Sequence, residues 1–410
     1  MKVKFFITVF VLVFTGISVC LPANTVQQGK VALENTVQLY PLIGKWRFQT
    51  GDDLKYASGN FDDSSWGWAS IPGVWSMMGI EYTEQAWYRL RFTLSNRFAE
   101  IPVAVQVPVI YDAHELYLNG IFIGGAGLID SNGTVVKKGS LPGIYQMPKN
   151  LLRMDEENVL ALRVADDVGW GGVAKSDFMI GRYELLDLQF TKFIIWNSSL
   201  VFILIFLGTF FLMLYRTYSK EKNFLYFSLL TYILSTLLFG YYSLPYLLVD
   251  RFWFVHIVTN TGAHLAMVFL FKFVYSFYGF RKDLVLRFFT YSGFLIAFLL
   301  ISPFHVTLLK FYAHIIYNIA IVIDAFGLLI LVGLLVKGIA LKRYQSKIVG
   351  IGSLVAFACV ANDIAGYFLA LDNQQWMMEG LVIFMISISF AMFIRYSRLD
   401  SRIVHPALDE

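Results

Sequence analysis

The 410-residue sequence has only two cysteines, Cys20 and Cys359. Cys20 closes a hydrophobic segment at the N-terminus, and Cys359 lies in a hydrophobic stretch much later in the chain. No disulfide bond can therefore stabilise the more polar region that extends to residue 190. That region must rely on a hydrophobic core of its own.

Charged side chains are scarce too. They make up 15% of the sequence, against 57% hydrophobic and 17% aromatic residues. Because a soluble domain usually carries about 25% charged residues, this deficit predicts segments that face a lipid bilayer. No run of five or more lysines and arginines occurs, so we expect no binding to nucleic acid.

Several motifs that mark catalytic sites are also absent. The sequence contains no HExxH or CxxC spacing, and no Walker loop or GxSxG motif lies in a suitable context. The last hydrophobic segment has no lysine, which argues against a retinal Schiff base. We therefore expect a protein without enzymatic activity, without a bound metal and without a cofactor.

The N-terminus has the pattern of an export signal. Lys2 and Lys4 precede a short apolar run with small residues at its exit. This pattern is typical of a signal peptide, which we place at residues 1–23, with cleavage after Cys20 or Ala23. Two alternatives remain open, namely lipidation of Cys20 and an uncleaved membrane anchor.

Residues 30–190 show hydrophobicity with a period of two. Polar and apolar residues alternate over 86–94, 103–107, 113–118 and 159–164, and turn residues such as Asn119-Gly120 and Pro142-Gly143 separate the runs. Short alternating runs between turns predict an antiparallel β-sandwich. Trp46, Trp75 and Trp87 are expected in its core, because tryptophan and tyrosine dominate such cores.

A series of short motifs occurs here in the order seen in a known domain. The motifs are Gly44-Lys45-Trp46-Arg47-Phe48, Phe61-Asp62-Asp63-Ser64-Ser65-Trp66, Ile71-Pro72-Gly73-Val74-Trp75, Trp87-Tyr88-Arg89, His114-Glu115-Leu116-Tyr117-Leu118-Asn119-Gly120 and Asn158-Val159-Leu160-Ala161-Leu162-Arg163-Val164. Together they resemble the galactose-binding-type jelly roll that precedes the catalytic barrel in family-two glycoside hydrolases. The resemblance implies a fold of the carbohydrate-binding type. It does not imply hydrolysis, because no barrel follows to carry the catalytic pair of carboxylates.

A ligand site in this domain would use aromatic rings and loop residues. An exposed tryptophan ring can stack on a sugar ring, and loops carry binding groups. The candidates for contact with a small molecule or saccharide are Trp66, Trp68, Asp166, Asp167 and Trp170. The alternatives are core packing for the tryptophans, and solvated turn positions or calcium ligands for the two aspartates.

The joint between the two halves of the chain is short. We expect a last strand over residues 178–188 and a first hydrophobic helix from near Phe193, with no stretch rich in glycine, serine or proline between them. Such a joint is expected to transmit motion of the β-domain instead of absorbing it.

Seven hydrophobic segments occupy residues 193–396. They cover residues 194–215, 223–248, 253–278, 288–308, 311–336, 346–370 and 377–396. Each is long enough to cross about 30 Å of hydrocarbon as a helix, so a seven-helix transmembrane bundle is predicted. A short tail, residues 397–410, follows the last segment.

Basic residues at the ends of these segments predict the orientation. With residues 30–190 outside, the inner connections and the tail hold 13 lysines and arginines, and the outer connections hold 2, Arg251 and Lys310. The inner ones are Arg216, Lys220, Lys222, Arg281, Lys282, Arg287, Lys337, Lys342, Arg343, Lys347, Arg395, Arg398 and Arg402. By the positive-inside rule, this asymmetry predicts a multi-pass protein of the bacterial cytoplasmic membrane. Its β-domain is expected to be periplasmic or extracellular and its C-terminus cytoplasmic.

A jelly roll of this type followed by seven helices resembles the bacterial seven-transmembrane receptors with diverse intracellular signalling modules. Membership would imply ligand sensing outside and control of an output inside, typically a diguanylate cyclase, a histidine kinase or a phosphatase. The sequence departs from that pattern after Tyr396, where 14 residues remain and no output motif occurs. We therefore expect a separate cytoplasmic signalling protein to supply the output.

Polar residues inside the hydrophobic segments form a second group of candidates, because they are costly in lipid. His256, Asn260 and His264 are spaced four residues apart, which places them on one helix face. The other candidates are His314, Asn318, Asp324, Asn362 and Asp363. Three interpretations remain open: hydrogen bonds that fix helix packing, a ligand-binding or proton-responsive pocket, and a metal site of the three histidines with an aspartate.

These patterns favour a membrane receptor whose β-domain binds a small molecule outside the membrane. Two alternatives come from different classes. One is a heptahelical membrane enzyme of the metal-dependent hydrolase type, and the other is an envelope scaffold without a signalling role.

Overall fold

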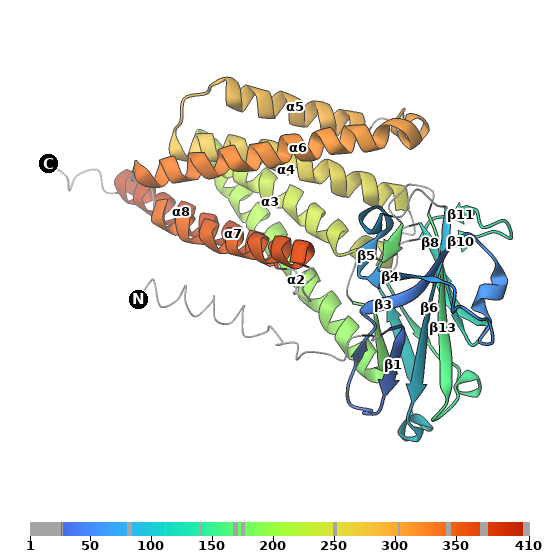
Figure 1. The fold of residues 1–410 in the computed structure, drawn as a ribbon. Helices are drawn as coiled ribbons and strands as arrows, with labels where there is room; N and C mark the ends of the chain where they lie inside the picture. The colour runs from blue at the N-terminus through green and yellow to red at the C-terminus, as the bar shows by residue number, and fades with distance from the viewer. Residues whose placement is uncertain are drawn as a thin grey trace. The chain divides into compact units, whose positions relative to one another are not determined.

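The computed structural model describes residues 26, 28–79, 84–110, 112–139, 142–166, 171–173, 177–248, 252–301, 304–341, 346–369 and 376–404. The predicted signal peptide, residues 1–23, lies outside them. The chain divides into two compact units, Met1–Leu188 and Gln189–Glu410. The first is built mainly of β-strands and the second of α-helices (Figure 1).

The first unit contains a seven-stranded sheet. Six strands follow the order β4 (Gly67–Ile71), β3 (Gly44–Thr50), β6 (Gln85–Leu94), β13 (Glu157–Ala165), β8 (Ala113–Leu118) and β9 (Ile121–Ala126). All neighbours in this order are antiparallel, as predicted. The seventh strand, β1 (Lys30–Leu33), differs because it runs parallel to β6. β3 pairs with the first half of β6 and β1 with its second half, so two short strands share one edge of a longer one.

A four-stranded antiparallel sheet shares a hydrophobic core with the first sheet. Its order is β12 (Gly143–Gln146), β7 (Val103–Val107), β15 (Met179–Arg182) and β2 (Tyr40–Pro41). Two short antiparallel pairs accompany these sheets, namely β10 (Leu128–Ile129) with β11 (Val135–Lys137) and β5 (Gly73–Val74) with β14 (Gly172–Val173). The unit therefore consists of antiparallel sheets with one parallel strand added.

The shared core is filled by alternate residues of the strands. Tyr88 of β6 and Val105 of β7 both belong to it and are fully buried. Trp46 is also fully buried in this core, and Trp75 is 4% exposed. Trp87 is fully buried in a smaller cluster on the opposite face of the seven-stranded sheet. The prediction that these three tryptophans serve packing is confirmed.

That opposite face is covered by the segment that follows β3. The segment contains a short 3-10 helix, η1 (Leu54–Ala57), and it packs Ala57 and Trp66 against Trp87 of β6. The middle strands of the sheet are consequently buried on both faces. This double burial explains why Arg89 of β6 and Arg163 of β13, which point away from the core, still have almost no exposed surface.

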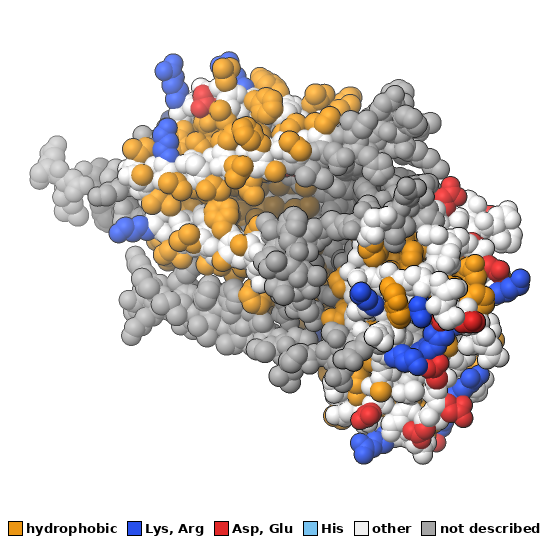
Figure 2. Space-filling view, viewed as in Figure 1, with side chains coloured by type: hydrophobic (Ala, Val, Ile, Leu, Met, Phe, Trp, Pro, Cys, Tyr) orange, Lys and Arg blue, Asp and Glu red, His pale blue; other side chains and the backbone are white. Residues whose placement is uncertain are grey.

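Seven long α-helices lie in the described part of the chain, in agreement with the predicted number. They are α2 (Tyr183–Thr217), α3 (Lys222–Tyr241), α4 (Phe252–Tyr278), α5 (Leu284–Ile301), α6 (Phe304–Ala340), α7 (Ser346–Leu369) and α8 (Met377–Val404). Each is long and apolar enough to cross a membrane. Large apolar side chains point outward, such as Phe202 and Phe206 at 69% exposure and Leu329 at 70%, and Figure 2 shows hydrophobic side chains over much of the visible helical surface. Such helices indicate a multi-pass membrane protein.

The joint between strand and helix differs from the prediction. Residues 178–188 were expected to form a strand, but β15 ends at Arg182 and α2 begins at Tyr183. The backbone N–H of Tyr183 still donates to the carbonyl of Pro102 at 2.9 Å, so the helix starts directly from the sheet. Glu184 lies in the first turn, where a negative charge suits the positive end of the helix dipole.

The bounds of two other helices also differ from those of the predicted segments. The segment expected at 288–308 is α5, which starts and ends earlier, and the segment expected at 311–336 is α6, which starts earlier and ends later.

The helical unit has its own apolar core, in which α4 contacts α3, α5 and α6. Phe227 of α3, Phe271 of α4 and Phe289 of α5 belong to this core. The rings of Phe271 and Phe289 are stacked with centroids 4.3 Å apart. α7 and α8 pack against each other along their length.

Candidate functional site

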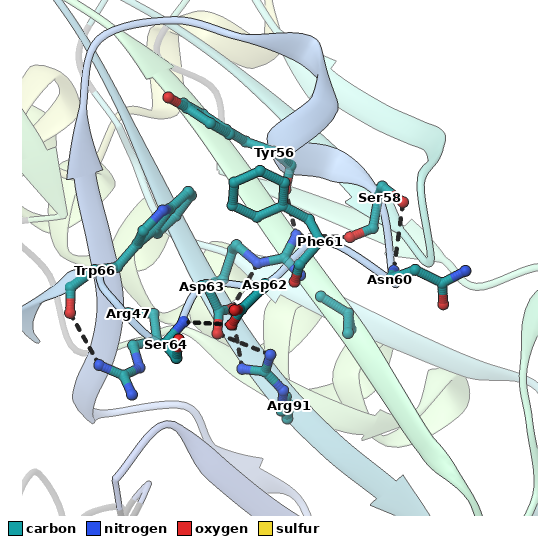
Figure 3. A network of polar contacts seen from close by, with 12 residues as sticks. Arg47, Tyr56, Ser58, Asn60, Phe61, Asp62, Asp63, Ser64, Trp66 and Arg91 are labelled. Atoms are coloured by element: carbon teal, nitrogen blue, oxygen red, sulfur yellow. Dashed lines mark hydrogen bonds and ion pairs between the residues drawn. The ribbon is translucent and has the colours of Figure 1, made fainter.

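A buried charged network lies on the face of the seven-stranded sheet that points away from the core (Figure 3). Arg89 and Arg91 of β6 point to this face because side chains alternate along a strand. Asp63 Oδ2 accepts a hydrogen bond from Arg89 Nε at 2.7 Å, and Asp63 Oδ1 lies 2.8 Å from Arg91 Nη2. Arg89 Nη1 also donates to the carbonyl of Ser58 at 2.9 Å and to that of Tyr56.

Burial makes this network structural. Arg89 is 0% exposed and Asp63 is 2% exposed, so neither can reach a ligand from solvent. Burial alone would raise the pKa of Asp63, but the hydrogen bonds from Arg91 and Arg89 outweigh it and hold that pKa below its usual value. The network therefore fastens the segment around η1 to the sheet.

A second charged network surrounds Arg163 of β13, which is 3% exposed. Arg163 Nε donates to Asp52 Oδ1 at 2.8 Å, and Arg163 Nη1 donates to Glu115 Oε2 at 2.9 Å. Asp52 Oδ1 also accepts from Trp87 Nε1 at 3.0 Å, and Glu115 Oε2 accepts from the Tyr117 hydroxyl at 2.7 Å. The side chains of Asp52 and Glu115 are 14% and 20% exposed, so this network reaches the surface.

The predicted ligand contacts Trp66 and Trp68 have different surroundings. Trp66 is 6% exposed and its ring meets Tyr56 edge-on at a centroid distance of 5.0 Å. Trp68 is 42% exposed, with the Arg47 guanidinium 4.1 Å from its ring centroid. The rim of the Trp68 ring also lies close to the backbone of Gly29. Trp66 thus has little ring surface open to a ligand, and stacking on Trp68 stays a prediction.

Asp166 is a buried residue directly after β13. It is 1% exposed, and its Oδ2 accepts a hydrogen bond from the N–H of Gly171 at 2.8 Å. Its own N–H donates to the carbonyl of Glu84 at 2.8 Å. The carboxylate is therefore buried and bonded to the backbone of Gly171, and it is not solvated. Asp167 and Trp170 lie outside the described residues.

In the helical unit, His264 of α4 and Asp324 of α6 are brought together. Their Nδ1 and Oδ2 atoms are 2.6 Å apart, and their side chains are 6% and 26% exposed. Such a contact fixes the packing of two helices. Asn260 lies one turn before His264 on α4.

The metal site predicted from His256, His264 and His314 is not tested by the structure. The side chains of His256, His314 and Asn318 lie outside the described residues, although their backbones belong to α4 and α6. Among the described side chains, no group of three or more His, Cys, Asp and Glu residues has an arrangement that could hold a metal ion.

Asn362 and Asp363 form hydrogen bonds near the start of the last helix. Asp363 Oδ1 accepts from the backbone N–H of Trp376 at 2.7 Å, and Asp363 Oδ2 accepts from that of Met377 at 2.8 Å. Asn362 Nδ2 donates to the same carboxylate at 3.2 Å. Asp363 therefore caps α8, which is a structural role.

Two polar contacts were not anticipated from the sequence. Asp52 and Arg163 are 111 residues apart, so only the pairing of the strands between them brings them together. The sequence feature that could have indicated this contact is a charged residue at alternate positions of a strand whose other residues are typical of burial on both faces. The second contact joins the Tyr242 hydroxyl to Glu379 Oε1 at 3.2 Å, and Glu379 was the only carboxylate within the last hydrophobic segment.

No family model matches the sequence, and no curated protein matches it. Among solved structures, a β-glucuronidase from Bacteroides uniformis matches at 21% identity over 35% of this chain and 18% of its own, with a TM-score of 0.29. A β-glucuronidase from glycoside hydrolase family 2 matches at 18% identity over 35% and 17%, with a TM-score of 0.30. A β-glycosidase from Bacteroides vulgatus matches at 19% identity over 35% and 20%, with a TM-score of 0.28. This chain therefore spans only 17–20% of the length of these enzymes, and the similarity defines neither activity nor ligand.

Proposed function

We propose that the protein is a membrane receptor. Its β-unit, a jelly roll of the galactose-binding type, binds a small molecule outside the cytoplasmic membrane. The seven helices pass the resulting change to a separate signalling protein on the cytoplasmic side. No catalytic step is required of this chain.

The observation that carries this proposal is the direct passage from β15 into α2. β15 ends at Arg182 and α2 runs without a break from Tyr183–Thr217. The first turns of α2 belong to the β-unit, where Leu186 is 0% exposed. A flexible linker would absorb a movement of the sheet, whereas a helix rooted in the sheet carries that movement along its axis.

The proposed orientation is supported by the distribution of basic residues. Arg216 lies in the last turn of α2 and Lys337 in the last turn of α6, and both helices would end on the cytoplasmic side. Positive charges near helix ends favour that side during insertion. A ligand can shift the bundle only if it binds one of its two states more tightly.

This function predicts a ligand-dependent movement at the cytoplasmic ends of the helices. Spin labels at Met213→Cys in α2 and Val336→Cys in α6 would occupy positions that are 63% and 59% exposed. With both native cysteines replaced by serine, the full chain in lipid nanodiscs is exposed to pools of neutral sugars, uronic acids, amino acids, nucleosides and organic acids. At least one pool should shift the distance between the labels by about 2 Å or more.

The control pair is Phe202→Cys with Met213→Cys, because both positions lie on α2 and their separation should not change. A distance between α2 and α6 that stays the same with every pool contradicts the receptor function.

A further inference from the structure

Strand β9 is an edge of the seven-stranded sheet and carries an exposed aromatic ring. Phe122 is 55% exposed and lies opposite Tyr117 in the register of β8 and β9. The two rings meet edge to face with centroids 5.7 Å apart. Tyr117 is itself packed against the buried cluster around Trp87. The Phe122 ring is therefore held from one side while much of it faces solvent.

A fixed carboxylate lies on the same face of the sheet. Glu115 and Tyr117 are two residues apart on β8, so both point to the face that carries Phe122. Among the described residues, the hydrogen bonds to Glu115 come from Arg163 and Tyr117, and both fall on Oε2. Oε1 is left as an acceptor on a side chain that is 20% exposed.

Both donors to Oε2 keep their protons at neutral pH. Burial, together with the hydrogen bond to Glu115, raises the pKa of Tyr117 well above its ordinary value, so its hydroxyl keeps its proton at neutral pH. Arg163 remains charged at any physiological pH. The orientation of the Glu115 carboxylate is thus set before a ligand arrives, which lowers the entropy cost of binding.

The residue of β9 that pairs with Glu115 has no side chain. Glu115 is paired with Gly125, and a Cβ atom at position 125 would lie 2.3 Å from the carbonyl oxygen of His114. At position 124 a Cβ would lie 2.2 Å from the ring of Tyr145. A side chain is therefore excluded at position 125 by the backbone of β8 and at position 124 by the ring of Tyr145. Gly125 therefore presents only backbone where it pairs with Glu115.

Spacing and charge define the ligand class. Phe122 lies opposite Tyr117, and Glu115 is two residues before Tyr117 on β8, with a β-bulge between Leu116 and Tyr117. Diagonal neighbours on paired strands lie about 7–8 Å apart, so a ligand the size of a pyranose ring that lies over Tyr117 can reach both Phe122 and Glu115. An aromatic face packs against the apolar C–H side of a sugar, and a carboxylate oxygen accepts hydrogen bonds from its hydroxyls. Asp52 and Glu115 carry two negative charges against the one positive charge of Arg163, so an acidic sugar would be repelled.

We infer that the face formed by Phe122, Glu115 and Gly125 binds a neutral saccharide, with Phe122 as the stacking surface and Glu115 Oε1 as the hydroxyl acceptor. The inference rests on the proposed receptor function and specifies its ligand class and binding residues. It places the site on the open face of β8 and β9 and not at Trp66 or Asp166, which are buried.

The test uses the full chain in lipid nanodiscs and calorimetric titration with maltotriose, cellotriose, laminaritriose, mannotriose and glucuronic acid. At least one neutral trisaccharide should bind, and glucuronic acid should bind at least tenfold more weakly. Phe122→Ala should weaken saccharide binding at least tenfold, and Glu115→Gln at least fivefold. Val136→Ala is the matched control, because Val136 is 62% exposed on β11 and should leave affinity unchanged.

Each outcome decides the inference. Saccharide binding that survives both Phe122→Ala and Glu115→Gln overturns the site and leaves the receptor function intact. If Glu115→Gln fails to fold, Phe122→Ala still tests the site, because an exposed ring can be removed without opening the core. If no neutral trisaccharide binds but another pool moves the spin labels, the ligand class is wrong and the receptor stands. If glucuronic acid binds as tightly as the neutral sugars, the charge argument is wrong and the inference falls.

Discussion

Asp63→Ala is expected to lower the free energy of unfolding of the β-unit by about 3–5 kcal/mol. Arg89 is 0% exposed and donates to Asp63 at 2.7 Å, so removing the carboxylate leaves a buried guanidinium without its counter-ion. The segment around η1 would also lose its main attachment to the sheet. Urea unfolding followed by tryptophan fluorescence measures the loss, because six of the nine tryptophans precede residue 188.

A surface ion pair provides the control. Lys30 and Glu157 are 3.1 Å apart, but their side chains are 68% and 45% exposed. Lys30→Ala should therefore change the free energy of unfolding by less than about 1 kcal/mol. Equal effects of Lys30→Ala and Asp63→Ala would show that Arg89 can find other partners or water. The structural role assigned to the network in Figure 3 would then be wrong.

Acidification is expected to destabilise the β-unit through His114. The side chain is 1% exposed in the core of the unit, and burial lowers its pKa from 6.5 to about 4. The Tyr145 hydroxyl lies 3.2 Å from its Nε2 atom, and within the described residues its Nδ1 atom has no hydrogen-bond partner. A protonated ring would therefore place a charge and an unsatisfied N–H inside the core.

The direction of the pH effect follows from the two pKa values. Between pH 6.5 and about 4 the unfolded chain binds a proton at His114 and the folded chain does not. The stability that depends on a neutral His114 is therefore fully present above pH 6.5 and is lost as the pH drops through this window. The loss from this residue amounts to about 3 kcal/mol, since one pH unit corresponds to about 1.4 kcal/mol.

His114→Gln removes the titrating group while keeping a polar side chain in place. Its unfolding free energy should change less than that of the wild type between pH 7 and 4, whatever its absolute stability. The measurement is urea unfolding at a series of pH values. Parallel pH profiles for the wild type and His114→Gln would show that other groups cause the acid sensitivity.

Much of the β-unit could be predicted because a sheet with a buried face requires alternating residues. The pattern over 86–94 corresponds closely to β6, and the Asn119-Gly120 turn joins β8 and β9 with both residues at positive φ. β1 could not be placed in the same way, because its four residues carry no information about direction. Its parallel pairing depends on the half of the β6 edge that β3 leaves open.

The joint at β15 was mispredicted for a related reason. Residues 183–188 contain both polar and apolar residues at short spacing, which fits a strand as well as the start of a helix. The structure resolves this ambiguity through burial, since Leu186 is fully buried while Glu184 and Leu188 are exposed. Local periodicity over six residues is too short to distinguish a period of two from one of 3.6.

The site residues show what single-sequence reasoning can reach. Trp66 and Trp68 appear equivalent in the sequence, but β4 starts at Gly67, so Trp66 belongs to the covering segment and not to the strand. The spacing of His256, Asn260 and His264 made His264 a candidate from the sequence. Its contact with Asp324 joins two helices over a separation of 60 residues and could not be read from either helix alone.

The proposed receptor function requires that an odd number of helices cross the membrane and that the β-unit lies outside. This can be measured by labelling single cysteines with a membrane-impermeant maleimide in right-side-out spheroplasts. Ile121→Cys lies at a position of β9 that is 53% exposed, and Ser397→Cys lies at an exposed position near the end of α8. We expect labelling at position 121 in intact spheroplasts and at position 397 only after permeabilisation. Labelling of both positions from the same side would contradict the proposed topology and, with it, the receptor.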